Sequence, residues 1–347
     1  MTSRSLAVRA FLRYLASTKR PIIIGPWRSE LGFEVLYWLP FLSWAIQYAK
    51  IPKERCYAVS RGGMGALYPT AGQVDLYTLL SNGSGDTDGV DALRLQNQID
   101  AEANLKRKQI RVTAWDRDVC RKAAAHLGLT GGYHVLHPSW MYWLFDDFWE
   151  ERASARLIMQ HTQYEPMATP TLPEGLTLPW QFLAVRFYER YTFPLKGHVR
   201  ELAIGITQAL AQHVPVILLN QPVCTDDHVD LPIAGDNIFT LPIVPPEQNF
   251  ILQAAVLARA AGFVGTYGGI AQWALRYGKP SVSFYTEFQG TSHAHRAWSS
   301  ILSAQTKVPF EVSSLKAFRL WQMATGVPVP KNEARGSSVT AAVPALV

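Results

Sequence analysis

The sequence predicts an α/β fold with two domains, each built on a parallel sheet, and three observations favour it. Short apolar segments typical of buried strands alternate with longer segments of helical pattern along most of the chain. A proline-rich stretch near the middle separates two such alternating halves. The length of 347 residues is also what about two domains require. Strands that alternate with helices form parallel sheets with right-handed crossovers, so we expect two Rossmann-like domains facing a cleft.

The first domain is expected over residues 1–163, and it begins with a basic helix over residues 1–20. A loop is indicated at 81–89 by its Gly, Ser and Asp content. Short apolar segments predict strands at residues 21–25, 55–60, 109–114 and 133–137. Longer segments between them predict helices at residues 32–49, 90–107, 116–127 and 139–159.

Residues 164–180 contain four prolines and no periodicity, which indicates a linker. The second domain is expected over residues 181–326, and the tail at 327–347 is expected to be disordered because it is rich in Ala, Val, Ser and Pro. The second half predicts strands at 181–187, 215–220, 237–241, 262–265 and 280–285. It predicts helices at 197–213, 247–261, 269–277, 295–304 and 314–323.

Composition excludes several classes of protein. With 48% apolar and 17% charged residues, the chain is not of the disordered class. No apolar run reaches the roughly 18–20 residues of a membrane span. The three cysteines are far apart and form no CxxC pair, so a disulfide framework or a cysteine zinc site is not expected. The chain start lacks the pattern of a signal peptide, and we expect a cytoplasmic protein.

The positive charge is concentrated at one end. Residues 1–20 hold five basic and no acidic residues, so of the formal net charge of +6 the rest of the chain carries only +1. A broad nucleic-acid surface is therefore not expected. The basic helix has two interpretations: it binds an anionic membrane surface at the inner face of the cell membrane, or it packs on the first domain with its charges solvated. The apolar residues that can share one face are Leu6, Phe11, Leu12 and Leu15.

The strongest functional signal is the loop Thr266-Tyr267-Gly268-Gly269, between a predicted strand and a predicted helix. Paired glycines let a phosphate approach the backbone, and the free N–H groups of a helix N-terminus favour an anion. The alternative is a tight turn without a ligand.

The unit at residues 262–285, a strand, a small-residue loop, a helix, a Gly-Lys-Pro turn and a strand, resembles the donor-binding domain of GT-B glycosyltransferases. The resemblance covers residues of about 181–325. It implies a nucleotide-sugar donor as substrate, no cofactor, no catalytic metal and a polysaccharide or lipid-linked glycan acceptor. Many such enzymes hold the donor ribose with an acidic residue in this helix, where this sequence has Gln272 and Trp273.

Further donor contacts are expected near the ends of other strands in the second half. Arginine binds phosphate as a bidentate fork, so arginines beyond the first of these strands are candidates to neutralise a diphosphate. The alternative for them is surface pairing with Glu189. The candidate donor residues, besides the 266–269 loop and Gln272, are Arg186, Tyr188, Arg190, Lys196 and Asn220. The Asp-Asp-His run at 226–228 does not have the spacing of a metal site.

Candidates for acceptor binding and for the general base come from the first half. A base must be a carboxylate or imidazole that reaches the acceptor hydroxyl, and the candidates are Glu30, Glu34 and His137. We favour Glu30 because it lies nearest the loop after the first strand; its structural alternative is a charge at a helix start. The candidate acceptor-binding residues are Trp27, Arg28, Arg61, Trp140 and Tyr142.

Two other functions remain open from the sequence. A pyruvyltransferase or a sugar-nucleotide epimerase would use the same two-domain architecture. A non-catalytic nucleotide-binding or scaffold protein would keep only the phosphate loop. A nicotinamide-dependent oxidoreductase is not favoured, because no G-x-G-x-x-G follows the first strand of either half.

Overall fold

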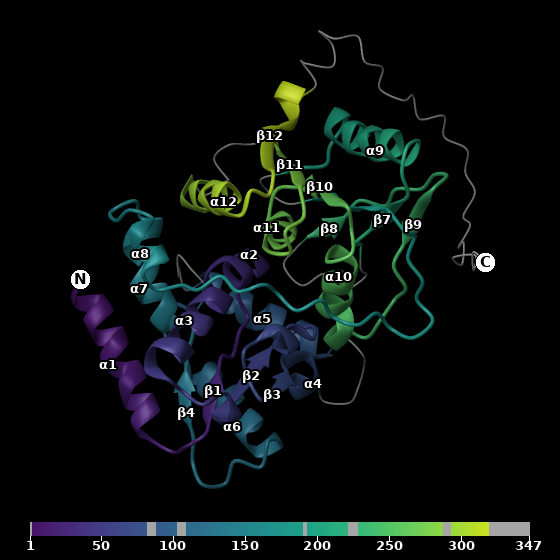
Figure 1. The fold of residues 1–347 in the computed structure, drawn as a ribbon. Coiled ribbons are helices and arrows are strands. Elements are labelled where there is room, and N and C mark those ends of the chain that lie inside the picture. Colours follow the sequence, from purple (N-terminus) through teal and green to yellow (C-terminus); the bar gives the residue numbers. More distant parts are fainter. Residues whose placement is uncertain are drawn as a thin grey trace. The chain divides into compact units, whose positions relative to one another are not determined.

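The structure is a computed structural model that describes residues 2–81, 88–102, 109–189, 193–220, 228–286 and 293–318 (Figure 1). The chain forms two compact units. Unit 1 comprises residues 1–168 and 244–251, and unit 2 comprises residues 169–243 and 252–347. The chain first passes from unit 1 to unit 2 after residue 168, inside the proline-rich stretch that was predicted to be a linker. The return of residues 244–251 to unit 1 was not expected.

Unit 1 is built on a four-stranded parallel sheet in the order β3-β2-β1-β4. The central strand β1 consists of three isoleucines with no exposed surface, as expected for a parallel strand covered on both faces. Its middle residue Ile23 pairs with Tyr57 of β2 and Val135 of β4. The strands are β1 (Ile22–Ile24), β2 (Cys56–Ser60), β3 (Gly72–Asp75) and β4 (His134–Leu136).

Helices connect and cover this sheet. A capping box explains the start of α6, because Thr113 accepts a hydrogen bond from the Asp116 N–H while Asp116 accepts one from Thr113. Pro40 lies in the first turn of α3, where its missing N–H costs nothing. The helices are α1 (Ser3–Ser17), α2 (Leu31–Phe33), the π-helix η1 (Glu34–Trp38), α3 (Leu39–Ala49), η2 (Lys53–Arg55), η3 (Met64–Leu67), α4 (Leu76–Leu80), α5 (Asp88–Glu102), α6 (Ala114–His126), α7 (Ser139–Trp149) and α8 (Arg156–Met159).

The basic helix α1 packs on unit 1 against α3 and α7. Val8, Leu12 and Leu15 are fully buried in this contact, whereas Leu6 is 52% exposed. The buried face therefore differs from the predicted one, because Leu6 lies outside it. None of the helices in the described residues is long and apolar enough to cross a membrane.

Unit 2 is built on a six-stranded parallel sheet in the order β12-β11-β10-β5-β7-β9. Counted along the chain this is the strand order 3-2-1-4-5-6 of Rossmann folds, with the reversal between β5 and β10. The strands are β5 (Leu183–Arg186), β7 (Val216–Leu218), β9 (Ile238–Thr240), β10 (Gly262–Thr266), β11 (Ser281–Tyr285) and β12 (Phe310–Ser314). A separate antiparallel pair joins β6 (Tyr188–Glu189) to β8 (Val229–Asp230).

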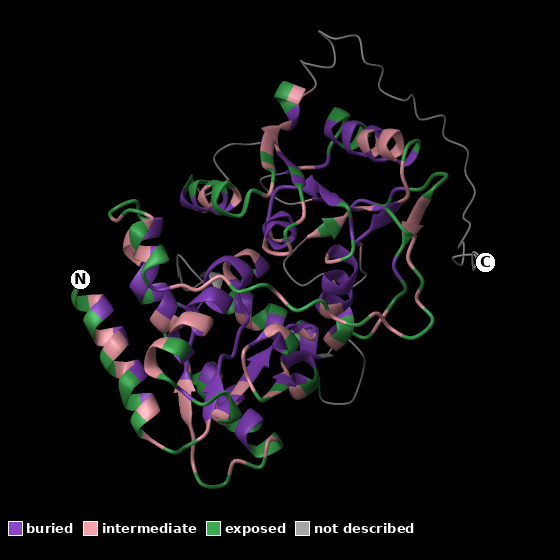
Figure 2. Cartoon of the chain, in the orientation of Figure 1, coloured by how far each residue is buried: buried purple, intermediate pink, exposed green. Residues whose placement is uncertain are grey.

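Helices alternate with these strands as predicted. The helix α9 lies against an apolar cluster to which β5, β7 and β10 contribute Val185, Val216 and Val264. Figure 2 shows the central strands as largely buried. The helices of the second half are η4 (Pro246–Gln248), α10 (Asn249–Leu257), α11 (Gly269–Arg276) and α12 (His293–Thr306). The predicted organisation as two parallel α/β sheets is thus confirmed.

Some predicted elements are wrong. Residues 109–114 form no strand: Ile110 and Val112 are 38% and 41% exposed, and Gln109 is buried as a hydrogen-bonding partner of residues 26–28. The fourth strand of unit 1 is instead Gly72–Asp75, and β12 at Phe310–Ser314 was not predicted. The predicted tail at 327–347 lies outside the described residues.

Candidate functional site

Ligands of parallel α/β sheets bind beyond the carboxyl ends of the strands, at the point where the strand order reverses. In unit 1 this point lies between β1 and β4, and in unit 2 between β5 and β10. Arg28 and His137 follow the two strands in unit 1. Arg186 ends β5 and the glycine pair 268–269 follows β10 in unit 2. These five of the sequence candidates thus lie at the topological switch points of the two sheets.

In unit 1 the switch point holds a buried ion pair. Arg28 and Asp116 both have fully buried side chains, and Arg28 Nε lies 3.2 Å from Asp116 Oδ1. Arg28 Nη1 donates to Asn97 Oδ1 at 3.2 Å, and the Arg28 backbone N–H donates to Gln109 Oε1 at 2.9 Å. A charge withdrawn from water must be paired in this way. Arg28 is therefore an internal group and not an exposed acceptor contact.

His137 belongs to the same cluster. Its Nδ1 accepts a hydrogen bond from the Ser139 backbone N–H at 3.1 Å, so the proton of the neutral ring lies on Nε2, which is 3.6 Å from Asp116 Oδ2. Although burial opposes ionisation, the His137 ring and the Arg28 guanidinium hold the pKa of Asp116 well below its ordinary value. With 2% exposure, Nδ1 hydrogen-bonded and Nε2 facing Asp116, His137 is arranged to position Asp116 rather than to contact a substrate.

Glu34 is enclosed in a second polar cluster, at the start of the π-helix η1. Only 1% of it is exposed, and its Oε1 accepts hydrogen bonds from Ser60 Oγ at 2.9 Å and from the Tyr68 hydroxyl at 2.6 Å. Burial and the Glu34 charge together raise the pKa of Tyr68 well above its ordinary value. The carboxylate of Glu34 thus ties η1 to the end of β2.

Glu30 differs from the other two base candidates, because its side chain is exposed. It occupies the N-cap position of α2 and its side chain caps none of that helix's N–H groups. Its place after β1 puts an accessible carboxylate at the carboxyl edge of the unit 1 sheet. Among Glu30, Glu34 and His137, it is the group whose geometry leaves it open to a substrate.

The aromatic acceptor candidates are largely core residues. Trp27 is fully buried and stacks on Trp38 and Tyr142 at ring distances of 5.7 and 6.2 Å. The Tyr142 hydroxyl shares a 2.7 Å hydrogen bond with Ser29 Oγ. Trp140 is half-buried and stacks on Phe11 of α1 at 4.2 Å. Trp27 and Tyr142 thus support the loop after β1 from within unit 1, whereas Trp140 contacts α1.

Arg61 and the two glycines after it are covered by the segment 244–251. Arg61 is fully buried, donates to the Ser29 backbone oxygen and lies 5.0 Å from the Phe250 ring. A Cβ on Gly62 would lie 2.5 Å from Phe250 Cδ2, so only glycine admits this close approach. Arg61, a candidate acceptor-binding residue, is therefore an internal group covered by this segment.

Asp75 is a polar group of this edge that the sequence analysis missed. At the end of β3, it accepts hydrogen bonds from the Gly63 N–H at 2.8 Å and the Tyr77 N–H at 2.9 Å. Burial raises the pKa of Asp75 to about 7; the two N–H bonds and Arg61 oppose the shift, and Glu247 adds to it. An aspartate directly before an apolar helix is an N-cap signal that could have drawn attention to it.

In unit 2, Arg186 is paired internally. Its Nε and Nη2 lie 2.8 and 3.2 Å from the two carboxylate oxygens of Asp230, and its Nη1 donates to Gln253 at 3.2 Å. The partner is thus Asp230 of β8 and not the neighbouring Glu189. Tyr188 is buried beneath this guanidinium, with its ring stacked on His228 at 4.2 Å. The bidentate fork that was expected to hold a diphosphate holds the β6–β8 pair instead.

The phosphate loop itself is well defined. Thr266 Oγ1 accepts a hydrogen bond from the Tyr188 N–H at 3.1 Å, and the Tyr267 N–H donates to the Phe284 oxygen at 2.8 Å. These bonds use Thr266 and Tyr267 to join the ends of β10, β6 and β11. Neither residue therefore offers these groups to a ligand, and the free donors lie further along the loop.

The helix α11 starts without a side-chain cap and without an acidic residue in its first turn. Gly268 is its N-cap and Gly269 its first residue, and Gln272 is buried in the first turn. Within the described residues, the backbone N–H groups of 269–271 find no acceptor. An uncapped helix N-terminus at a switch point is a suitable anion site.

The remaining donor candidates are spread over other loops. Lys196 is exposed just before α9, and Asn220 donates to the Leu231 backbone oxygen at 2.9 Å. Arg190 lies outside the described residues. The described part of the chain contains no group of three or more His, Cys, Asp or Glu residues that could hold a metal ion.

No family model and no curated protein matches this chain. Among solved structures, it is similar to a glycosyl transferase family 9 protein from Veillonella parvula, with 11% identity, a TM-score of 0.43 and coverage of 90% of this chain and 91% of that one. It is similar to E. coli ADP-heptose lipopolysaccharide heptosyltransferase II, with 10% identity, a TM-score of 0.44 and coverage of 85% and 90%. It is also similar to UDP-GlcNAc 2-epimerase from Methanocaldococcus jannaschii, with 9% identity, a TM-score of 0.35 and coverage of 91% and 94%. A glycosyl transferase and a heptosyltransferase are among the solved structures to which this chain is similar.

Because of the buried ion pair, we expect substitutions of two aspartates of α6 to have very different effects on the free energy of unfolding. Asp116→Asn should lower the free energy of unfolding by about 3–5 kcal/mol, because it leaves Arg28 buried without a counter-charge. Asp118→Asn removes an exposed partner of Arg121 and should cost at most about 1 kcal/mol. Urea unfolding of the two variants measures both values, and equal costs would contradict the assigned role of Asp116.

The position of Asp75 predicts a pH dependence. Its pKa is 3.8 in the reference state and about 7 in the folded protein, so the folded state binds the extra proton between these values. Stability should therefore fall as pH rises from about 4 to 7, and Asp75→Asn should flatten this fall, each unit of pKa displacement corresponding to about 1.4 kcal/mol. Unfolding at several pH values tests it. The exposed Asp91→Asn serves as control, and the same slope in the wild type and Asp75→Asn would refute the prediction.

Proposed function

We propose that the protein is a glycosyltransferase that moves a sugar from a nucleotide-activated donor to a glycan acceptor. The observation that carries the proposal is the open N-terminus of α11 at the switch point of the unit 2 sheet, where Gly268 and Gly269 leave the helix uncapped. This position suits the diphosphate of a nucleotide sugar, because the N–H groups and the helix dipole favour two adjacent negative charges.

The proposed donor contacts follow from what each side chain already does. The N–H groups of residues 269–271 bind the diphosphate and Gln272 contacts the nucleotide ribose. Arg186 acts through Asp230, whose strand pairs with that of Tyr188, and so holds Tyr188 beside the loop without a direct bond to the ligand. Lys196 and Asn220 remain candidate nucleotide contacts, as does Arg190.

In the proposed reaction the acceptor hydroxyl oxygen bonds to the anomeric carbon of the sugar while the bond from that carbon to the diphosphate oxygen breaks. The hydroxyl proton passes to the carboxylate of Glu30, the exposed member of the three base candidates. The electron pair of the broken bond leaves on the nucleoside diphosphate, whose charge the α11 N-terminus stabilises. Glu34 and His137 position the loop that carries Glu30.

The proposal extends to an acceptor that is a polysaccharide or a lipid-linked glycan, to a cytoplasmic location and to peripheral contact of α1 with the inner face of the membrane. A sugar-nucleotide epimerase would use the same donor site and would change the sugar instead of transferring it. Product analysis separates the two, because transfer or hydrolysis releases nucleoside diphosphate and a simple epimerisation leaves it attached to the sugar.

A substitution at the helix cap tests the donor site. Gly268 has extended backbone angles, which any residue adopts, and Asp and Asn are both favoured N-cap residues. We expect Gly268→Asp to keep or raise the melting temperature and to weaken binding of UDP, ADP or GDP at least tenfold, through repulsion and occupied N–H groups. Gly268→Asn has the same shape without the charge and should weaken binding less. Equal nucleotide affinity in the wild type and Gly268→Asp, measured by calorimetry, would contradict the site.

The role of Glu30 is tested by turnover. Glu30→Gln should lower the rate of nucleoside diphosphate release from UDP-, ADP- or GDP-sugars by about a hundredfold or more, with nucleotide affinity unchanged. Glu54→Gln, which alters another exposed glutamate of unit 1, should leave the rate unchanged. If both variants turn over like the wild type, Glu30 is not the base. Tight nucleotide binding without any turnover in the wild type would favour the non-catalytic binding protein.

A further inference from the structure

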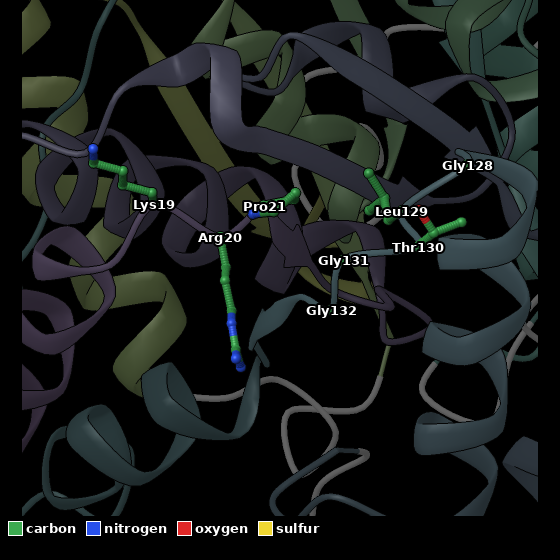
Figure 3. Close-up of a pocket in the computed structure, with 8 residues that line it drawn as sticks. All are labelled: Lys19, Arg20, Pro21, Gly128, Leu129, Thr130, Gly131 and Gly132. Carbon is green, nitrogen blue, oxygen red and sulfur yellow. The ribbon is translucent and has the colours of Figure 1, made fainter.

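A cavity of about 380 Å³ lies in unit 1 between the end of α1 and the turn before β4 (Figure 3). Two segments line it, residues 19–21 and residues 128–132. None of the eight lining residues is acidic, two are cationic and three are glycines. Because both segments precede strands, the cavity lies at the amino ends of β1 and β4, away from the polar clusters at their carboxyl ends.

Arg20 is the cation closest to the glycine turn. Its guanidinium Cζ and Nη1 lie 3.9 Å from the position that a Cβ on Gly132 would take. In Figure 3 its side chain extends past this turn, whereas the Lys19 side chain points away from it. Within the described residues, the Arg20 guanidinium has neither an ion pair nor a hydrogen bond. It therefore presents its charge and its N–H donors to the solvent of the cavity.

A second guanidinium supports this charge. Arg55 donates to the backbone oxygen of Arg20 at 2.7 and 3.0 Å, to that of Leu15 at 3.0 Å and to Thr18 Oγ1 at 3.1 Å. These acceptors are all neutral, so they hold Arg55 in place without cancelling its charge. Together with burial, the charges of Arg20 and Arg55 lower the pKa of His134 at the start of β4. The end of the sheet is thus a region of positive potential.

The turn at residues 128–132 has two parts, of which the first ends the helix α6. The Gly128 N–H donates to the Ala125 oxygen at 3.1 Å and the Leu129 N–H to the Ala124 oxygen at 2.9 Å, which is the Schellman pattern that ends α6. These bonds cap the negative end of α6 and account for Gly128. They do not account for the glycines at 131 and 132.

Gly132 has a φ of +81°, and its neighbour Gly131 has open space where a Cβ would be. Among the described residues, no acceptor is found for the backbone N–H of either glycine. Successive N–H groups in a turn with one positive φ can converge on an anion. Here they occur on the wall of a cavity that also holds an unpaired guanidinium.

We propose that this cavity binds a phosphate-bearing anion, held by the Arg20 guanidinium and the N–H groups of Gly131 and Gly132. A guanidinium fork and backbone donors match the several acceptor oxygens of a phosphate. The phosphate belongs either to a free ion or small phosphorylated molecule, or to a lipid head group that reaches the basic end of α1. The site does not depend on the glycosyltransferase proposal, because it uses other residues at the opposite edge of the sheet.

Titration of the ¹⁵N-labelled full chain with inorganic phosphate, at constant ionic strength set with chloride, tests the site. We expect saturable shifts of the amide resonances of Gly131 and Gly132. Arg20→Gln should raise the dissociation constant at least tenfold, and the charge-matched control Arg200→Gln, at an exposed position of α9, should not change it. Gly131→Asp should abolish binding without disturbing the fold, because its Cβ meets no atom within 4 Å.

Vesicles distinguish the two sources of phosphate. Binding to phosphatidylcholine vesicles that contain phosphatidylglycerol, reduced by Arg20→Gln and not by Arg200→Gln, would assign a lipid head group. Phosphate-dependent shifts without vesicle binding would assign a free anion. The proposal is overturned if neither probe binds, if chloride alone produces the same shifts, or if Arg20→Gln and Arg200→Gln behave alike.

Discussion

The arrangement of unit 1 depends on the need to balance one charge inside it. Arg28 lies in the loop after the central strand β1, and its side chain is buried where no water can solvate it. Asp116 is the carboxylate that balances its charge. Asp116 also closes the capping box of α6, and its other oxygen faces His137 beyond β4. One carboxylate therefore connects a loop, a helix start and a neighbouring strand. Through Arg28, it anchors the loop that carries the exposed Glu30, two residues further on.

Unit 2 also balances the charge of a buried arginine, with a different carboxylate. Arg186 ends the first strand of its sheet, and like Arg28 it is neutralised internally, here by the two oxygens of Asp230. In both units the arginine at the switch point is structural, and the groups left open are backbone N–H groups or an exposed carboxylate. Residue type alone therefore does not show which groups bind a ligand and which support the fold. An arginine at the end of a strand can fix a loop as well as it can hold a phosphate.

The parts of the fold that the sequence predicted correctly are those determined by local pattern. The apolar runs at β1, β7 and β10 and the glycine-opened helix α11 carry their signals within a few residues. What the sequence could not predict depends on distant partners. Asp116 is 88 positions from Arg28, and Asp230 is 44 positions from Arg186, whereas the nearby Glu189 was the obvious partner. Gln109 was assigned to a strand because nothing local shows that it serves Arg28.

Unit 1 is completed by the segment 244–251, which follows the first part of unit 2 in the chain. Phe250 covers Arg61 and Gly62, yet it is made after 75 residues of unit 2, those from 169 to 243. Residues 1–168 precede this segment in the chain, so the end of β2 has this cover only once residues 244–251 are present. A fragment that ends in the proline-rich stretch lacks Phe250, so Arg61 and Gly62 lose this cover in such a fragment.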